Sequence, residues 1–351
     1  MNSLYKSVIS FVFSLSISIV FGQDVIETPR PDMSAEHRQL IKKVFSLTYE
    51  GLDAGQLNNT TETLKGMLKK SDHKYDRYII TFHLTFFYAQ AKEYEKCLNL
   101  LVAGQQEGFF FPAITGNFTW PEYLSELKKL ERFNSWSQEN KRRQEQAQKN
   151  AKAEYFIQTP IGYTKEKTYP LLLVFHGGID SNISSYANWQ SPRLQSKYIV
   201  AYLQGNAVRG SFHRGLGSKR QAIAKQAYQQ IIQKYAVDTN RVMVGGASAG
   251  AMEAFAIAQD RVISVTGAIL GFPGPCKCDE AKLKRAAKEG LRVALLTGEN
   301  DGALRYQKEL GVFFDKVGLP NRFVVFPGIG HQFPEDFSAQ IDISLDYIWN
   351  K

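Results

Sequence analysis

Apolar residues recur at two different spacings along the chain, and the change falls near residue 151. From residue 34 to residue 151 the spacing is that of one face of a helix, without the alternation that strands show. The expected helices cover residues 34–50, 55–70, 74–92, 93–107, 121–133 and 134–151. This part of the chain is therefore predicted to be all-helical.

After residue 151 short apolar runs alternate with helical patterns. Residues 153–158 are expected to form an edge strand, and residues 170–175 are continuously apolar, as in a strand buried on both faces. Further strands are expected at 198–203, 241–244, 265–270, 293–297 and 322–326, with helices at 218–235, 249–260, 279–289 and 303–317. The alternation predicts an α/β fold with a mostly parallel sheet that helices cover on both faces.

A turn of small residues, GASAG at 246–250, separates one expected strand from the helix that follows it. A serine in a strained strand-to-helix turn is exposed and can be held against a base, and small neighbours avoid clashes with adjacent elements. Ser248 is therefore the expected nucleophile, and the backbone N–H of Ala249 is expected to point at the oxyanion. A purely structural turn is the alternative.

A second source of oxyanion donors is expected upstream. His176, Gly177 and Gly178 directly follow the apolar run at 170–175. Glycine N–H groups at the carboxyl end of a strand can approach a substrate oxygen closely, so Gly177 and Gly178 are expected to complete the oxyanion hole. His176 is expected to be structural.

The acid and the base of such a site follow the serine in chain order, on loops after later strands. Asp301 follows the strand expected at 293–297, with Glu299 as its rival, and His331 follows the last strand. In the expected mechanism His331 takes the serine proton, Asp301 holds the ring, and water then cleaves the acyl-enzyme. This chemistry needs no cofactor and no metal.

The substrate pocket is expected to be lined by side chains near these loops. They are Ile179, Trp189, Phe212, His213, Met252 and Phe272. Their arrangement depends on how the loops fold, which periodicity does not determine.

The N-terminus predicts export. Lys6 precedes an apolar run at 8–21, and small Gly22 and a polar switch at Gln23 follow, as in a secretory signal peptide. The expected organisation is a signal peptide at 1–22, a helical domain with linker at 23–151 and a catalytic domain at 152–351. The protein is then secreted or periplasmic, and no membrane span is expected after removal of the signal.

Charge and cysteine content argue against other classes of protein. The formal charge of +9 is mild for 351 residues, and both signs are interspersed, so nucleic acid is not an expected partner. Cys97 falls in a helical pattern and is expected to be a buried apolar residue. Cys276 and Cys278 are expected to be ordinary loop residues, with a local disulfide as the alternative.

Residues 155–347 resemble secreted poly(3-hydroxybutyrate) depolymerases and feruloyl esterases, in the sequence VDTNRV at 237–242, the turn around Ser248, and Met252. The patterns G-x-x-D at 298–301 and G-H-x-F-P at 330–334 are typical of phospholipase/carboxylesterase-like hydrolases more broadly. The resemblance implies the α/β-hydrolase fold and a serine esterase. Residues 85–101 resemble half of a tetratricopeptide repeat, whose stacked helices bind partner proteins, and a packing role is the alternative.

Together these features predict an exported serine hydrolase that cleaves a small-molecule or polysaccharide-linked carboxylic ester, with a protein partner for the helical region. A serine peptidase of prolyl-oligopeptidase type shares this fold and order, although the sequence shows no obvious acidic pair to grip a peptide amino terminus. A partner-binding scaffold with a non-catalytic hydrolase domain is the other alternative. The complete set Ser248, Asp301 and His331 argues against it.

Overall fold

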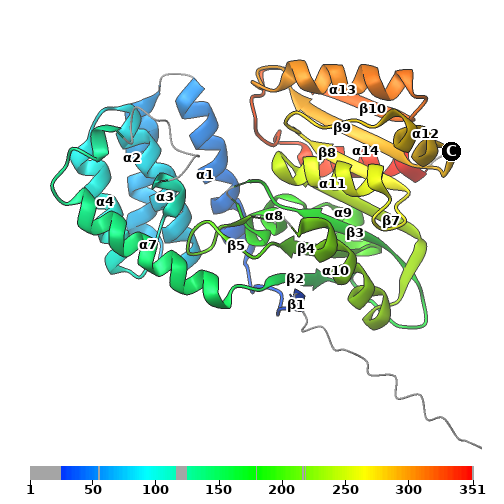
Figure 1. Cartoon of the computed structure of the whole chain (residues 1–351), viewed down its shortest axis with the longest axis horizontal. Helices are drawn as coiled ribbons and strands as arrows, with labels where there is room; N and C mark the ends of the chain where they lie inside the picture. The colour runs from blue at the N-terminus through cyan, green and yellow to red at the C-terminus, as the bar shows by residue number, and fades with distance from the viewer. Residues whose placement is uncertain are drawn as a thin grey trace, which may run out of the picture.

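An eight-stranded sheet forms the centre of the larger of two lobes, in the order β1-β2-β4-β3-β7-β8-β9-β10 (Figure 1). The computed structural model describes residues 25–53, 56–115, 125–178, 180–215, 217 and 219–349. The expected signal peptide at 1–22 and the predicted pocket residue Ile179 lie outside the described residues. The strands are β1 (Val25–Glu27), β2 (Ala153–Gln158), β3 (Tyr169–Phe175), β4 (Ile199–Gln204), β7 (Val237–Ala247), β8 (Gly267–Gly271), β9 (Arg292–Gly298) and β10 (Asn321–Phe326).

The sheet is mostly parallel, as the apolar runs predict. Neighbouring strands from β4 through β3, β7, β8 and β9 to β10 are parallel. Strand β2 runs antiparallel to β4, and β1 runs parallel to β2. The carboxyl ends of the six parallel strands therefore lie at one edge of the sheet, where the loops that follow them meet.

Strand β1 corrects two predictions. Residues 23–151 are expected to form a helical domain with its linker, but Val25–Glu27 forms a strand that pairs with the first residues of β2. Strand β2 is therefore flanked on both sides, whereas 153–158 is expected at an edge. A strand of three residues is too short to show a period, so no local signal announces it.

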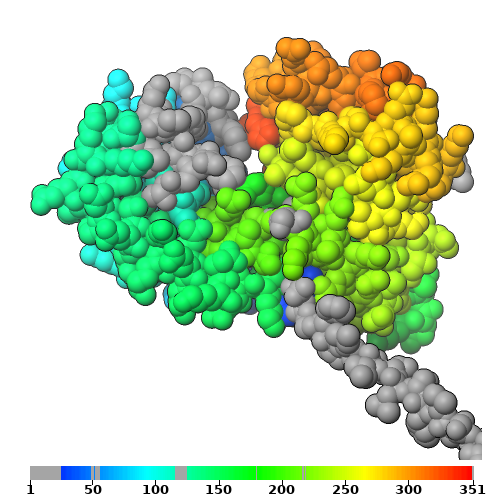
Figure 2. Space-filling view, in the orientation of Figure 1, coloured from blue at the N-terminus to red at the C-terminus, as the bar shows by residue number. Residues whose placement is uncertain are grey.

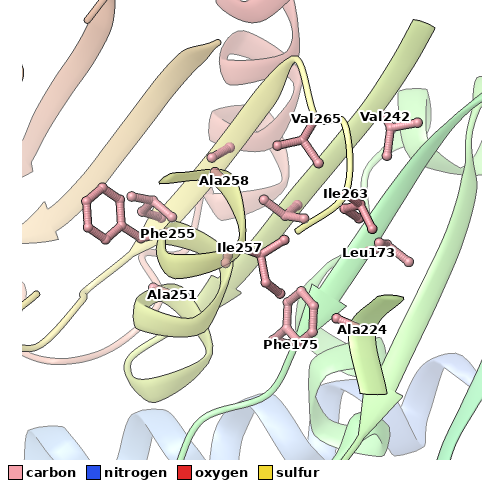
Figure 3. Packing of buried hydrophobic residues seen from close by; sticks show 14 of the residues in the cluster. Leu173, Phe175, Ala224, Val242, Ala251, Phe255, Ile257, Ala258, Ile263 and Val265 are labelled. Atoms are coloured by element: carbon pink, nitrogen blue, oxygen red, sulfur yellow. The ribbon is translucent and has the colours of Figure 1, made fainter. Parts of the chain in front are cut away.

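Alternate residues of β3 enter two different cores, one on each face of the sheet. Leu173 and Phe175 pack on one face with Ala251 and Ile257 of α11 (Figure 3). The helices that contribute to this core are α10 (Arg220–Lys234), α11 (Ala249–Asp260), α12 (Glu280–Lys288) and α13 (Leu304–Lys316). The other face is covered by α8 (Asn182–Asn188), α9 (Pro192–Lys197) and α14 (Phe337–Trp349), which periodicity does not predict.

The helical lobe comprises the described residues between 35 and 150, which lie between β1 and β2 in the chain, and it is beside the sheet (Figure 1). Its helices are α1 (Ala35–Asp53), α2 (Leu57–Lys70), α3 (Lys74–Gln90), α4 (Tyr94–Gln106), α5 (Pro112–Thr115) and α7 (Phe133–Asn150). Helix α3 is buried along most of its length and contacts α1, α2 and α4. Where a helix at 121–133 is expected, the described part holds one turn at 125–127. A tetratricopeptide arrangement stays a prediction.

Hydrogen bonds join the helical lobe to the α/β lobe, which comprises residues 25–27 and 153–349. The buried hydroxyl of Tyr75 in α3 lies 2.9 Å from Ser181 Oγ at the start of α8. The N–H of Phe110 donates to Ser211 Oγ at 2.8 Å, and Gln144 Nε2 donates to the carbonyl of Val208 at 3.0 Å. Among the described helices, none is long and apolar enough to cross a membrane.

We expect Tyr75→Phe to lower the free energy of unfolding by about 1 kcal/mol, because it removes a hydrogen bond between two buried hydroxyls. Urea denaturation measures the difference. Tyr78→Phe is the matched control, since Tyr78 lies on the same helix and its buried hydroxyl has no hydrogen-bond partner among the described residues. Equal destabilisation by the two substitutions would show that the Tyr75 hydroxyl does not help to join the lobes.

Candidate active site

Ser248 occupies the turn between β7 and α11 in a conformation that non-glycine residues rarely adopt. Its φ is 55° and its ψ is −122°, and its N–H donates to the carbonyl of Gly271 at 2.8 Å. Backbone of this kind is strained and persists only where the surroundings impose it. The strained turn lifts the serine above the end of the strand, as a nucleophile elbow requires.

Two glycines of the turn leave no room for a side chain. A Cβ on Gly250 would lie 2.1 Å from the carbonyl oxygen of Phe175, and one on Gly246 would lie 2.5 Å from the carbonyl carbon of Gly250. The turn therefore packs directly against the end of β3. Residues 176–178, the glycine loop, follow β3 directly, so this contact also brings Gly177 close to the Ser248 turn.

Asp301 and His331, which follow β9 and β10, are brought together. His331 Nδ1 lies 2.9 Å from Asp301 Oδ2, and the same oxygen accepts a hydrogen bond from Gln307 Nε2 at 3.0 Å. The N–H of Ala303 donates to the other oxygen at 2.8 Å. Burial opposes ionisation of Asp301, but the hydrogen bonds from His331, Gln307 and Ala303 outweigh it and hold its pKa below the usual value. The carboxylate is thus ionised at neutral pH, and Nδ1 of His331 carries the proton.

Glu299, the rival of Asp301, faces another partner. Its Oε2 accepts a hydrogen bond from the N–H of Gly328 at 2.8 Å, so it ties the loop after β9 to the loop after β10. Gln307 is a residue that sequence reasoning missed. It is fully buried in α13 and donates to both Asp301 and the carbonyl of Pro273. A single glutamine in a helical pattern carries no signal of such a role.

A cavity of about 1360 Å³ between the two lobes is lined by both Ser248 and His331. Gly177 and Gly178, which are expected to be oxyanion donors, and Phe272, an expected pocket residue, line it too. Figure 2 shows the helical lobe, blue to green, against the α/β lobe, green to red. Ala249 is the first residue of α11, where the first N–H groups of a helix have no intrahelical acceptor. Ser248, His331 and two of the expected oxyanion donors, Gly177 and Gly178, therefore line one cavity, while Asp301 is hydrogen-bonded to His331 and Ala249 directly follows Ser248.

The other described pocket candidates lie elsewhere. Trp189 is 1% exposed and belongs to the core on the face of the sheet that α14 covers. A Cβ on Gly245 would lie 2.8 Å from its ring. Phe212 and His213 pack against the helical lobe, the latter with its ring 4.9 Å from that of Tyr78. Met252 is not among the residues that line the cavity, and a Cβ on Gly274 would lie 3.1 Å from its Sδ. Their positions depend on loop paths and on the docking of the lobes, which the periodicity does not determine.

His176 holds the glycine loop. It is 1% exposed, and its Nδ1 lies 2.7 Å from the carbonyl oxygen of Gly177. Burial lowers the pKa of His176 to about 4, with a smaller opposing effect of the Gly177 hydrogen bond, so the ring is neutral. Cys276 and Cys278 are not joined in a disulfide, and Cys97 is buried in the helical lobe.

No protein-family model and no curated protein matches the sequence. An uncharacterized protein from Bacillus cereus ATCC 10987 aligns with 88% of this chain and 98% of its own, at 19% identity and a TM-score of 0.47. The esterase Est2 of Thermogutta terrifontis aligns with 56% of this chain and 86% of its own, at 17% identity and a TM-score of 0.41. A putative dipeptidyl aminopeptidase IV from Bacteroides ovatus aligns with 57% of this chain and 34% of its own, at 13% identity and 0.44. Similarity this low does not argue for one activity over another.

The order of the elements and the position of the Ser248 turn between β7 and α11 indicate the type of fold. A serine lies between a central parallel strand and its helix, and an acid and a histidine follow on loops after later strands. The arrangement matches an α/β-hydrolase fold. In α/β-hydrolases this edge of the sheet, at the carboxyl ends of the strands, carries the reacting groups, and here it faces the helical lobe.

A buried acid, Glu253, lies in α11, the helix that follows the Ser248 turn. Glu253 is 2% exposed, and its Oε2 lies 2.9 Å from Nε of Arg220, while its Oε1 has no partner among the described residues. Burial raises the pKa of Glu253 to about 7, although Arg220 opposes the rise. The folded protein therefore binds this proton more tightly than the unfolded chain does.

We expect Glu253→Gln to stabilise the protein at pH 8, by on the order of 1–2 kcal/mol, and to change little near pH 5. The wild type loses stability as the pH rises from the unfolded value, near 4.5, to about 7, because the buried carboxyl must then ionise. Thermal unfolding at both pH values measures this. Glu309→Gln, in an exposed pair with Arg305, is the control and should show no such pH dependence. A gain that is the same at both pH values would contradict the raised pKa.

We expect Asp301→Asn to slow the reaction of Ser248 with a fluorophosphonate probe by on the order of 10³-fold or more. An amide can hydrogen-bond to His331 but cannot stabilise the imidazolium that forms when the ring takes the serine proton. Glu299→Gln keeps an acceptor for the N–H of Gly328 and should react nearly as fast as the wild type. Labelling followed by mass spectrometry gives both rates. The opposite ranking would assign the acid to Glu299.

Proposed function

We propose that the protein is a serine hydrolase that cleaves carboxylic esters through an acyl-enzyme on Ser248. One observation carries the proposal: a serine in a strained elbow and a histidine hydrogen-bonded to a buried carboxylate line the same cavity. A turn with only a structural role would not require a strained backbone at Ser248. A histidine with only a surface role would not require a hydrogen bond to the buried carboxylate of Asp301. A scaffold function does not account for both features together.

In the proposed reaction His331 Nε2 takes the proton of Ser248 as Oγ bonds to the acyl carbon. The Asp301 carboxylate stabilises the imidazolium. The N–H of Ala249 and the N–H groups of the loop at Gly177 and Gly178 donate to the oxyanion. The imidazolium then gives its proton to the departing alcohol oxygen. In the second half water attacks the acyl carbon, its proton passes to His331, and Ser248 regains its proton as the acid leaves.

Esters are favoured over amides because the two leaving groups make different demands. An alcohol or phenol leaves readily with general-acid help, whereas an amine leaves only if its nitrogen is protonated in a well-fixed pose, which peptidases achieve by gripping the peptide. The cavity does contain one feature that favours the peptidase alternative. Glu335 and Asp336 are adjacent acids at its exposed rim, where an amino terminus could bind, and sequence reasoning overlooked them. Amide substrates with a free amino group therefore belong in the test.

We expect kcat/KM for a p-nitrophenyl ester to exceed that for the p-nitroanilide of the same acyl group by on the order of 100-fold. The pair changes only the leaving group, and an aminoacyl p-nitroanilide adds the free amine. Ser248→Ala is the control, and it should be inactive on all of them. Comparable values for ester and anilide would replace the esterase proposal with the peptidase one. Activity that survives in Ser248→Ala would place the nucleophile elsewhere.

We also propose export, which rests on the sequence of residues 1–22 alone. A partner protein for the helical lobe is a further prediction of the sequence. The lobe has a more direct task within the same molecule, because its helices face the cavity that contains Ser248.

A further inference from the structure

Two helices of the helical lobe form one wall of the catalytic cavity. Leu40 and Phe45 of α1 line it, together with Phe82, His83 and Phe86 of α3. None of these residues belongs to the α/β lobe, and none was expected at the site from the sequence. A helical domain in a hydrolase could equally have packed against the far side of the sheet, so this placement calls for a functional reason.

The rings of this wall are in mutual contact. The ring centroids of Phe45 and His83 lie 4.8 Å apart, those of Phe82 and Phe86 5.0 Å apart, and those of Phe82 and His83 5.6 Å apart. Burial lowers the pKa of His83 to about 3, so its ring is uncharged at neutral pH. We call these four residues the aromatic wall. Their side chains are uncharged, and Lys42 and Lys43 of α1 line other parts of the same cavity.

The α/β lobe contributes aromatic rings on the side of the reacting groups. Phe272 lies 6.0 Å from the ring of His331 and 5.9 Å from that of Phe333, and Phe333 lies 4.5 Å from Phe337. All three phenylalanines line the same cavity. The cavity that Ser248 lines therefore has apolar surface from both lobes.

The aromatic wall is held at a fixed place relative to Ser248. Tyr75, in the same helix as Phe82 and Phe86, is hydrogen-bonded to Ser181. The neighbouring residue Asp180 lines the cavity and accepts hydrogen bonds from the N–H of Ser181 and the hydroxyl of Ser184. The hydrogen bond that joins the two lobes therefore reaches Ser181, three residues after Gly178. A wall fixed in this way binds a ligand without first having to order itself.

We propose that the aromatic wall is the binding subsite for a bulky apolar group of the substrate. The preferred substrates are then esters with a long alkyl or an aryl group, and esters in which both parts are small are poor ones. The cavity, at about 1360 Å³, exceeds the roughly 300–1000 Å³ that is typical of sites for small ligands. Each methylene group that moves from water to such a surface adds to affinity, so activity should rise with chain length. This inference rests on the proposed function, since it names the substrates of the same site.

Phe86 offers the sharpest test, because it is only partly buried and its truncation leaves the core of α3 in place. We expect the wild type to prefer p-nitrophenyl octanoate over the acetate, and Phe86→Ala to lose about tenfold in kcat/KM on the octanoate and less than twofold on the acetate. Phe110→Ala is the matched control. Phe110 is a partly buried phenylalanine of the same lobe that does not line the cavity, and its hydrogen bonds to Ser211 come from the backbone.

The same comparison with octyl acetate and ethyl acetate shows whether the acyl or the alcohol part occupies the subsite. A chain-length preference in either series that Phe86→Ala removes supports the proposal. Equal losses on long and short esters, or a wild type without chain-length preference in both series, would overturn it. Melting temperatures of the variants separate these outcomes from unfolding, and Phe86→Leu keeps apolar surface and should retain most of the preference.

A second readout does not depend on ester turnover. Fluorophosphonates with an ethyl or a decyl chain both react at an activated serine, and the rate of labelling reports how well the chain is bound. We expect decyl to react faster in the wild type, and Phe86→Ala to remove that advantage. If Ser248 is labelled with this dependence but no ester is hydrolysed, the esterase proposal fails and the subsite stands. If esters are hydrolysed without any dependence on chain length, the subsite fails and the esterase proposal stands.

Discussion

The contact between the Ser248 turn and the end of β3 is the constraint on which the site depends. It is made by backbone atoms, because Gly250 lies so close to the carbonyl of Phe175 that even a methyl group would not fit. The same contact fixes the strained conformation of the turn, the position of the Ser248 hydroxyl and the position at which the glycine loop begins. In the proposed mechanism, donors on the loop and on α11 serve one oxyanion, which requires these two backbones to stay in place.

The candidate catalytic residues could be proposed from the sequence because each stands at the end of a strand, where a short stretch of sequence carries the signal. The small residues around Ser248 reflect the lack of space in the turn, and the apolar runs before Asp301 and His331 mark buried strands. The same signals could not separate Asp301 from Glu299, since both lie in one loop. Only the path of that loop, which turns one acid to His331 and the other to Gly328, distinguishes them.

The rest could not be predicted because it depends on contacts between distant parts of the chain. Trp189 belongs to the core under the sheet, and His213 is enclosed by rings of the helical lobe, although both stand near predicted loops. Conversely, Phe45 and Phe86 follow an ordinary helical spacing and reach the cavity only through the docking of the lobes. An apolar helix position that faces a substrate has the same sequence pattern as one that faces a core.

Strand β1 gives the helical lobe an unusual attachment. The chain forms one strand of the sheet, leaves it to build the whole lobe, and returns to form the next strand directly beside the first (Figure 1). In topological terms the lobe is an insertion into the hydrolase fold, anchored by two neighbouring strands of one rigid sheet. A domain joined by one linker can swing about that linker. A lobe anchored twice at the same edge has far less freedom to rotate, so the width of the cavity is set largely by how the chain folds.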